Sequence, residues 1–270
     1  MYLRLLTAIF ASWLCVNSTN AASWETIAPG LAYTHIPTPS ISTHGRIHAF
    51  RVSLQHYNLD IAMAADYDKL ALSANNFAKK TASLITINGG FFSPNYEPLG
   101  LRVQRGVTRS NLKNTSWWGV FYIKNHRGHI VSQHQYRKAT RPDFAIQAGP
   151  RLLINGSIPL LKDGYAERSA LCTTQSGDVV LIVTERAPLT TTQFARILQR
   201  PINKGGIGCY QALNLDGGSS SQLTAQLPSF SLKVMSFHDV TDAIIVEPKH
   251  RPPLPSKATT IYLAPGHSTK

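Results

Sequence analysis

The sequence contains few charged residues, and acidic residues are the scarcest of them. Only 15% of the 270 residues are charged, with 14 Asp and Glu against 27 Lys and Arg, while 43% are hydrophobic. A chain with this composition is neither disordered nor of low complexity. The formal net charge of +13 predicts a surface that attracts anions, which leaves nucleic acid, phosphate-bearing substrates, anionic glycans and lipid head groups open. The length allows one large domain or two small ones.

Long apolar runs are missing except at the start of the chain. Arg4 precedes an apolar run from Leu5 to Val16, and small or polar residues follow as far as Ala22. This three-part pattern is typical of a secretory signal peptide, so we expect residues 1–22 to be removed after Ala21 or Ala22. The run is shorter than the roughly 18–20 residues that a bilayer span needs, which makes a retained anchor the weaker alternative. The mature protein is therefore expected to have no membrane span and to be periplasmic or extracellular.

Cysteine is scarce, and one of the three, Cys15, lies inside the expected signal peptide. Cys172 and Cys209 remain as a pair in an oxidising compartment, where a disulfide is chemically allowed. We expect two buried free thiols instead, because a chain of this length does not need a covalent staple. Neither cysteine has a Cys or His at ligand spacing, and the histidines from His126 to His134 are expected to be solvated. No metal site and no cofactor are predicted.

Short apolar runs separated by turn residues dominate the rest of the chain. Strands are predicted at Ile47–Ala64 (two strands), Leu84–Ile87, Leu101–Gln104, Trp117–Ile123, Phe144–Gln147, Arg151–Ile154, Ser157–Leu161, Ser169–Thr174, Val179–Thr184, Gln211–Leu215 and Ala243–Val246. Helices are predicted after Ser73 and after Thr190, where Gln193 completes a capping box. The expected fold is a single α+β domain over residues 23–247, with a largely antiparallel or mixed sheet built of hairpins and two or three inserted helices. Residues 248–270 form a Pro-rich basic tail.

Two apolar strands break into an Asn or Asp followed by paired glycines. The residues concerned are Asn88, Gly89 and Gly90 in LITINGGFF, and Asn214, Asp216, Gly217, Gly218, Ser219, Ser220 and Ser221 in ALNLDGGSSS. Paired glycines allow positive φ and bring backbone N–H groups close to an anion or a sugar. A tight turn explains one such break equally well, so the repetition of the pattern is what favours a ligand site.

Two arginines stand at positions suited to a phosphate. Arg168 enters the apolar strand AERSALC beside Glu167, and Arg151 follows a Gly-Pro turn at Gly149. The planar guanidinium suits bidentate recognition of phosphate, although each arginine alone is expected to be a surface residue. The chain contains no G-x-S-x-G and no Gly-rich run ending in Gly-Lys-Ser/Thr, so neither a nucleophile elbow nor a P-loop is predicted.

Taken in order, these motifs resemble the phosphodiester glycosidase family. The resemblance rests on INGGFF, P-x-G-L, GVFYI, Q-x-G-P-R-L-L, E-R-S-A and NLDGGSSS, and it runs from about Ile47 to Val246. The family includes the lysosomal uncovering enzyme, which removes N-acetylglucosamine from its phosphodiester link to mannose 6-phosphate. The resemblance implies an α+β fold and hydrolysis of the bond between a sugar's anomeric carbon and a phosphate. The leaving group of that reaction is a phosphate monoester anion, so one carboxylate suffices.

The resemblance also implies which residues line the cleft. Asp216 is expected to act as a base or electrostatic stabiliser at the anomeric centre, Arg168 to bind the phosphate, and Glu167 to serve as a reserve carboxylate. Asn88 and the glycine N–H groups are expected to contact sugar hydroxyls or phosphate oxygens. The other expected substrate-binding residues are Gly89, Gly90, Phe91, Phe92, Gly149, Arg151, Asn214, Gly217, Gly218, Ser219 and Ser220. The family commonly has a third glycine where this chain has Ser219, a departure that affects the expected substrate more than the reaction.

Two non-catalytic functions remain as alternatives to the enzyme. One is a polyanion-binding or glycan-binding envelope protein, which the excess of Lys and Arg fits. The other is an inactive scaffold in the assembly of envelope polysaccharide. Nucleic acid is not an expected partner, because basic runs are short, such as Lys79 and Lys80, and are not interleaved with aromatic residues. The expected partner is a phosphate-bearing glycan.

Overall fold

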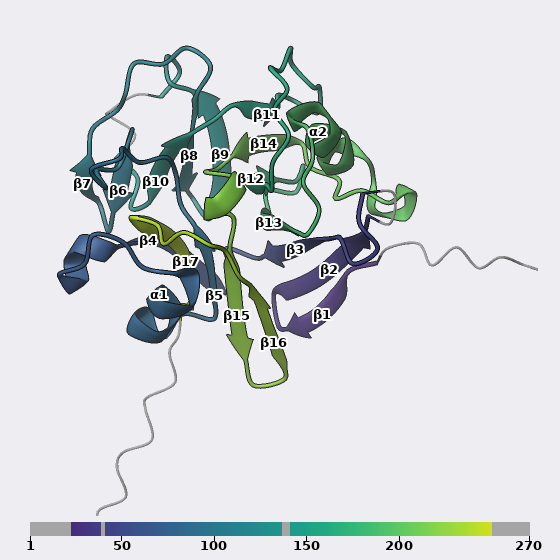
Figure 1. The fold of residues 1–270 in the computed structure, drawn as a ribbon, viewed down its shortest axis with the longest axis horizontal. Coiled ribbons are helices and arrows are strands. Elements are labelled where there is room, and N and C mark those ends of the chain that lie inside the picture. Colours follow the sequence, from purple (N-terminus) through teal and green to yellow (C-terminus); the bar gives the residue numbers. More distant parts are fainter. Residues whose placement is uncertain (1–22, 39–40, 137–140, 250–270) are drawn as a thin grey trace, which may run out of the picture.

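The computed structural model describes residues 23–38, 41–136 and 141–249, and these residues form three antiparallel sheets. The expected signal peptide and most of the expected tail lie outside the described residues. Every pairing between the strands is antiparallel, which confirms the antiparallel version of the predicted architecture. Figure 1 shows how the sheets surround the middle of the molecule.

The largest sheet has seven strands in the order β1-β2-β3-β13-β12-β14-β11. Its strands are β1 (Glu25–Ala28), β2 (Leu31–Pro37), β3 (Arg46–Val52), β11 (Arg151–Leu153), β12 (Ser169–Thr173), β13 (Val179–Glu185) and β14 (Gln211–Asn214). One five-stranded sheet has the order β16-β15-β5-β17-β4, with β4 (Tyr57–Met63), β5 (Ile85–Asn88), β15 (Leu223–Leu227), β16 (Phe230–Val234) and β17 (Asp242–Pro248). The other has the order β7-β6-β10-β8-β9, with β6 (Arg102–Gln104), β7 (Val107–Ser110), β8 (Gly119–Lys124), β9 (Arg127–Ser132) and β10 (Ala145–Ala148).

One apolar core is shared by all three sheets. Phe50 of the large sheet, Ile87 of β5 and Phe121 of β8 are each fully buried in the same cluster. Successive residues of a strand point to opposite faces, so Ala49 lies in a second cluster on the other side of β3. Both faces of the large sheet are therefore covered. The central strand β13 is accordingly apolar and buried on both faces.

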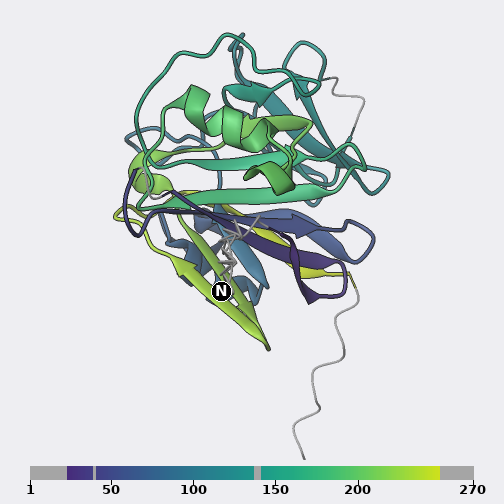
Figure 2. The ribbon, with the colours of Figure 1, turned by 90° about the vertical axis from the view of Figure 1, so that its right-hand side faces the viewer.

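Two α-helices cover the outer faces of two sheets. Ser73 caps α1 (Ala74–Thr81) by accepting a hydrogen bond from the N–H of Asn76. The predicted capping box of α2 (Thr191–Gln199) is confirmed. Figure 2 shows α2 and the β15–β16 hairpin on opposite sides of the stacked strands. Short 3-10 turns, η1 (Ala64–Tyr67), η3 (Ile202–Lys204) and η4 (Gly218–Ser220), complete the described helical segments, and none of these helices is long and apolar enough to cross a bilayer.

The second half of one predicted hairpin is wrong. Residues 157–161 form no strand, and their only pairing is an isolated bridge between Ile154 and Ser157. Pro159 cannot donate to a strand ladder and Leu160 is fully exposed, so the segment does not continue as a paired strand, although Ile158 and Leu161 pack against the core. The hairpin of β15 and β16 was not predicted, although apolar residues alternate with polar ones along both strands and Leu223 and Ala225 pack into the core.

The expectation of two free thiols is also wrong, since Cys172 and Cys209 form a disulfide. Their Cα atoms lie 5.8 Å apart. The reason is the topology of the sheet: Cys172 in β12 is paired with Ala212 in β14, and Cys209 precedes β14 by a short turn. Both cysteines are buried in the cluster beneath α2. Chain length indicated that a staple was unnecessary, but it carried no information on this proximity.

Breaking this disulfide is expected to lower the free energy of unfolding by about 2–4 kcal/mol, because the bridge restricts a long loop in the unfolded chain. The two cysteines are separated by 37 positions. The measurement is urea denaturation of the C172A/C209A variant against the untreated protein. Reductant should shift the midpoint of the native protein and leave that of the double variant unchanged. Equal midpoints for the oxidised protein and the double variant would contradict a stabilising bridge.

Candidate functional site

Four strand ends meet at the side chain of Asn88. Its Nδ2 donates to the backbone oxygen of Asp216 at 2.8 Å, and its Oδ1 accepts from the Ser169 hydroxyl at 2.7 Å and from the Gln222 N–H at 3.2 Å. These partners stand at the end of β14, the start of β12 and the start of β15, while Asn88 ends β5. The ends of these strands approach one another near the centre of Figure 1. The two predicted glycine loops are therefore brought together by one amide.

This arrangement leaves Asn88 no group for a ligand. The residue is fully buried, and its second Nδ2 hydrogen bond goes to the backbone oxygen of Gly89 at 3.3 Å. A carboxamide has two donor and two acceptor positions, and all four are used within the chain. The structure places Asn88 as the residue that positions Asp216, in contrast to the sugar or phosphate contact expected from the sequence.

A buried ion pair that the sequence did not reveal lies beneath the first glycine loop. Arg102 Nε and Asp242 Oδ2 are 3.1 Å apart, and both side chains are fully buried. The guanidinium of Arg102 also donates to the backbone oxygens of Phe91, Leu99, Gly100, Leu101 and Gln147. A charged residue inside the apolar strand at residues 101–103 was the available signal for Arg102, whereas nothing local marks Asp242 as its partner.

The paired glycines make room for this ion pair. The N–H of Gly90 donates to Asp242 Oδ1 at 3.2 Å, and the N–H of Gly89 donates to the backbone oxygen of Asp242 at 2.9 Å. A Cβ at Gly90 would collide with the Arg102 guanidinium. These N–H groups serve the fold, so they are not free for the anion or sugar that the sequence analysis assigned to them.

Gly89→Ala is expected to destabilise the protein by about 1–3 kcal/mol, because a side chain there must displace the buried carboxylate. A Cβ at Gly89 would meet the Oδ1 of Asp242 and lie 3.0 Å from its backbone oxygen. Thermal and urea unfolding measure the effect. Gly164→Ala is the matched control, since the nearest atom to its added Cβ is 4.0 Å away. Equal stability of the two variants would show that the loop shifts freely.

Asp216 is a carboxylate that solvent reaches at the place where the four strand ends meet. It is partly exposed, and its Oδ1 accepts the N–H of Gly217 at 3.0 Å. Burial raises the pKa of Asp216, and the hydrogen bonds of Ser220 and Gly217 only partly oppose that rise. The charge of Asp242 raises the same pKa further, while Arg102 lowers it. A carboxyl with a raised pKa that solvent still reaches is suited to exchange a proton with a ligand or to face a developing positive charge.

Arg168 and Glu167 hold neighbouring loops in place through hydrogen bonds within the chain. The Arg168 guanidinium donates to the backbone oxygens of Leu189, at 3.1 Å, and Gly164, and the side chain is 8% exposed. The Glu167 carboxylate accepts from the Thr184 hydroxyl and from the N–H of residue 187, while its backbone oxygen accepts the N–H of residue 218 at 2.8 Å. Within residues 23–38, 41–136 and 141–249, neither charged group contacts Asp216.

Arg151, the other arginine expected at the site, differs from Arg168 in that its guanidinium is unpaired among the described residues. Arg151 of β11 is paired with Leu213 of β14, and Leu213 stands three residues before Asp216. The aliphatic part of the Arg151 side chain lies over Gly119. Burial lowers the pKa of Arg151, and its guanidinium has no hydrogen-bond or ion-pair partner in the described part of the chain. Close by, Asn214 Nδ2 donates to the backbone oxygen of Gly149 at 3.2 Å. A half-buried unpaired guanidinium is an available anchor for an anion.

Ser219, the residue that departs from the family pattern, makes a contact with His238. The Ser219 hydroxyl and His238 Nδ1 are 2.7 Å apart, and the His238 N–H donates to the backbone oxygen of Ser219 at 3.2 Å. Gln222 fixes the same loop, since its Nε2 donates to the backbone oxygen of His238 at 2.9 Å. His238 is exposed. The sequence could not show this pair, because the whole β15–β16 hairpin separates its members.

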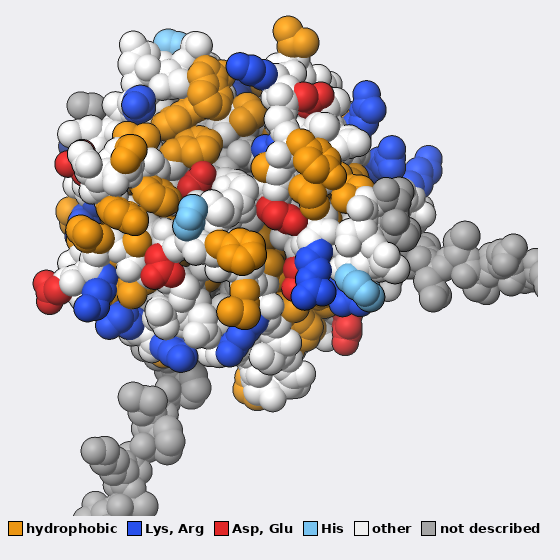
Figure 3. All heavy atoms as spheres, in the orientation of Figure 1, with side chains coloured by type: hydrophobic (Ala, Val, Ile, Leu, Met, Phe, Trp, Pro, Cys, Tyr) orange, Lys and Arg blue, Asp and Glu red, His pale blue; other side chains and the backbone are white. Residues whose placement is uncertain are grey.

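Aromatic side chains lie beside the two loops. The rings of Phe91 and Trp118 are 5.0 Å apart, and those of Phe92 and Tyr96 are stacked at 5.9 Å. Phe237, next to His238, is 97% exposed. Figure 3 shows many hydrophobic side chains on the face viewed in Figure 1. Among the residues described, no group of three or more His, Cys, Asp or Glu could hold a metal ion.

Solved structures from distant organisms share this fold. A hypothetical protein from Synechocystis matches with a TM-score of 0.58 at 16% identity, over 83% of this chain and 63% of that chain. The catalytic domain of zebrafish N-acetylglucosamine-1-phosphodiester alpha-N-acetylglucosaminidase, auto-inhibited by its pro-peptide, matches with a TM-score of 0.62 at 16% identity, over 84% of this chain and 86% of that chain.

Sequence comparison extends the similarity to a bacterial relative and to a family. The uncharacterized protein YigE of Escherichia coli strain K12 is 28% identical over 115 residues, which cover 38% of this chain and 45% of YigE. The match thus spans less than half of that relative. The sequence model of the phosphodiester glycosidase family matches residues 81–247, a segment that contains both glycine loops, Arg102 and Asp242. The chain therefore belongs to the phosphodiester glycosidase family.

Proposed function

We propose that this protein is an exported hydrolase that cleaves the bond between the anomeric carbon of a sugar and the phosphate of a glycosyl phosphodiester. The observation that carries the proposal is Asp216, a solvent-accessible carboxyl with a raised pKa, held where four strand ends meet in a member of this family. The zebrafish enzyme of the same fold is named for such a bond. The disulfide supports export, because structural disulfides persist in oxidising compartments.

In this proposal Asp216 is the catalytic carboxylate. Ionised Asp216 either takes a proton from the attacking water or faces the positive charge that develops at the anomeric carbon. The departing phosphate monoester is already a stable anion, so no strong general acid has to protonate it. A single carboxylate at the site is consistent with this chemistry.

Arg151 is the proposed anchor for the phosphate, in place of Arg168. The donors of Arg168 are occupied by backbone oxygens, whereas the Arg151 guanidinium has no protein partner in the part of the chain that the structure describes. Two N–H groups of a guanidinium can bind two phosphate oxygens at once. His238 adds a second nitrogen donor beside Ser219 when its ring faces the ligand.

Turnover of defined substrates tests the function. Purified protein is incubated with methyl phosphodiesters of glucose 1-phosphate, mannose 1-phosphate and N-acetylglucosamine 1-phosphate, and free sugar and methyl phosphate are quantified. We expect release from at least one diester, with methyl glycosides and bis(methyl) phosphate left intact. Binding of a diester without turnover would instead support a glycan-binding protein, and hydrolysis of bis(methyl) phosphate would identify a different phosphodiesterase.

Arg151→Gln is expected to raise KM for the diester by about tenfold to a hundredfold while changing kcat less, because a charge-assisted hydrogen-bonded pair contributes about 1.5–3 kcal/mol. Steady-state kinetics measure both constants. Lys233→Gln on β16 is the control, since it removes an exposed charge elsewhere. Unchanged KM in Arg151→Gln would remove Arg151 from substrate binding and leave Asp216 untouched.

A further inference from the structure

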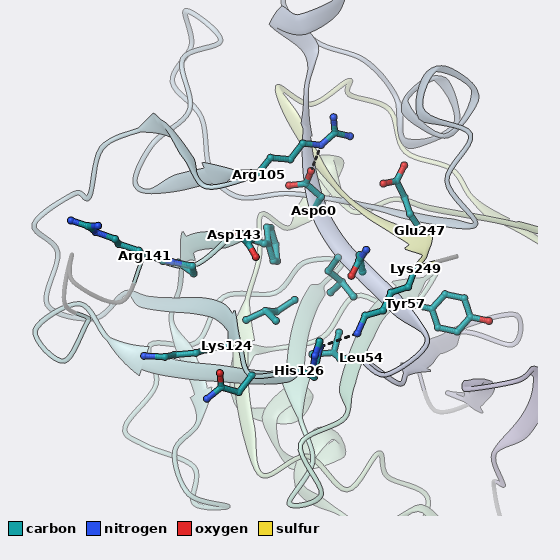
Figure 4. Close-up of a pocket in the computed structure, with 16 residues that line it drawn as sticks. Leu54, Tyr57, Asp60, Arg105, Lys124, His126, Arg141, Asp143, Glu247 and Lys249 are labelled. Atoms are coloured by element: carbon teal, nitrogen blue, oxygen red, sulfur yellow. Dashed lines mark hydrogen bonds and ion pairs between the residues drawn. The ribbon is translucent and has the colours of Figure 1, made fainter. Parts of the chain in front are cut away.

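A cavity of about 640 Å³ opens at the far end of the strands that carry the site. β17 begins at Asp242, beneath the first glycine loop, and reaches Glu247 in the cavity wall. Five strand residues span about 17 Å, so the cavity is separate from Asp216. Its volume lies within the range of about 300–1,000 Å³ that small-molecule and cofactor sites occupy. Figure 4 shows its labelled side chains.

Different elements supply the cavity with an apolar floor and a polar rim. Leu54, Leu59 and Phe144 of the floor belong to the shared core. The rim combines amides and carboxylates with cations, and its polar members are Asn58, Asp60, Arg105, Lys124, Asn125, His126, Arg141, Asp143, Glu247 and Lys249. Apolar surface beneath convergent polar groups is the composition of a site for a polar ligand with a ring face, such as a sugar.

Two contacts organise the rim. Arg105 Nε lies 3.1 Å from Asp60 Oδ2, so this pair is neutral as a unit. Lys249 Nζ lies 2.8 Å from His126 Nδ1, which places the imidazole as the acceptor of an ammonium hydrogen bond. Both contacts are drawn in Figure 4. No carboxylate in the described ranges forms an ion pair with Lys124, Arg141 or Lys249. Three cations at the rim are therefore available to a ligand.

Several rim residues of the cavity have a positive backbone φ angle. Arg105, Asn125, His126 and Arg141 have φ values of 48°, 52°, 55° and 39°. Arg105 lies in the two-residue turn between β6 and β7, and Asn125 and His126 form the two-residue turn between β8 and β9, where such hairpin turns require positive φ. Here, four of the nine described non-glycine residues with positive φ line one cavity. The turns thus place polar residues at the edge of the cavity, where the side chains of Lys124 and Arg141 extend away from Lys249, as Figure 4 shows.

We propose that this cavity is a second binding site, for an acidic oligosaccharide whose sugars carry carboxylate or phosphate groups. The acidic groups are bound at separate points, by Lys124 and Arg141 on one side of the cavity and by Lys249 on the other, and sugar hydroxyls are bound by Asn58 and Asp143 over the apolar floor. The rim carboxylates can accept hydrogen bonds from the many hydroxyl groups of a glycan, whereas the phosphate backbone of a nucleic acid offers few such donors, which favours a glycan. The site holds the glycan independently of the chemistry at Asp216.

Calorimetric titration of the full protein with tetragalacturonate tests the carboxylate form of the ligand, and titration with glucose 6-phosphate tests the phosphate form. Maltotetraose is the uncharged control. We expect at least one acidic probe to bind, with affinity that falls as salt rises, and maltotetraose to bind at least tenfold more weakly. The K124Q/K249Q variant should bind the acidic probe at least tenfold more weakly than the native protein.

Two further variants separate this site from the proposed active site. Lys233→Gln removes one exposed charge from β16 and should bind the acidic probe normally. Asp216→Asn should also bind it normally, even when turnover of a glycosyl phosphodiester is lost. Undiminished binding by K124Q/K249Q, equal binding of maltotetraose, or absence of binding by both acidic probes would each overturn the proposal. None of these outcomes bears on hydrolysis at Asp216.

Discussion

Asp216→Asn is expected to lower kcat/KM for a glycosyl phosphodiester by about 10²- to 10⁴-fold, the range over which a positioned acid–base group acts. Asparagine keeps the shape of the side chain and can still accept the N–H of Gly217, so the loop is retained while the charge is lost. Because burial raises the pKa of Asp216, the acidic limb of the native pH profile should lie above the ordinary aspartate pKa of about 3.9. Asp216→Asn should lack that limb in its residual activity.

Stability provides the control for this variant. Below a pH of about 3.9, Asp216 is protonated in the folded and the unfolded chain; above it the unfolded chain ionises first, so the folded state loses stability as the pH rises through the raised pKa. Asp216→Asn removes that loss. We expect its unfolding temperature at pH 7 to equal or exceed that of the native protein. Full activity of the folded Asp216→Asn variant would refute a catalytic role for Asp216.

Arg102→Met is expected to lower the free energy of unfolding by about 3–5 kcal/mol, because it leaves the Asp242 carboxylate buried and unpaired. The change also removes hydrogen bonds to several backbone oxygens of residues 91–101. The ionised carboxylate would then lie in an apolar interior, which is among the costliest arrangements in a protein. Urea denaturation measures the loss of stability. The proposed turnover of a glycosyl phosphodiester should fall together with the folded fraction.

A double-mutant cycle isolates the ion pair in this second prediction. Asp242→Asn alone leaves Arg102 charged and should also destabilise, whereas R102M/D242N should be less destabilised than the sum of the single variants, since neither charge remains. Arg105→Met is the matched comparison, because Arg105 is exposed although it also faces an aspartate. Additive effects across the cycle would mean that Arg102 acts through its carbonyl contacts alone.

Local patterns predicted much of this molecule. Apolar alternation identified most strands of the core, and the Thr190–Gln193 capping box identified α2, because both signals depend on neighbouring residues. The repeated break into Asn or Asp and paired glycines also predicted that two distant loops belong together. The hydrogen bond from Asn88 to the backbone oxygen of Asp216 joins these two loops.

Long-range pairing accounts for what the sequence did not reveal. Asp242 lies far along the chain from Arg102, and the contact between Ser219 and His238 spans a hairpin. The Cys172–Cys209 bridge depends on the order of strands in the sheet. Neighbouring residues constrain none of these distances. The same limit explains why Gly89 and Gly90 were assigned to a ligand, when their missing side chains accommodate a buried ion pair.

The dependence of the site on Asn88 has a consequence for when the protein becomes competent. The Asn88 side chain joins residues near positions 88, 169, 216 and 222. The adjoining ion pair cannot form before Asp242 is present. A chain synthesised or threaded through a channel from its N-terminus has no complete site until nearly all of the described residues have emerged. Such non-local contacts also form late in folding. The proposed hydrolysis therefore requires the finished molecule, and we expect a truncated chain that ends before β17 to be inactive toward glycosyl phosphodiesters.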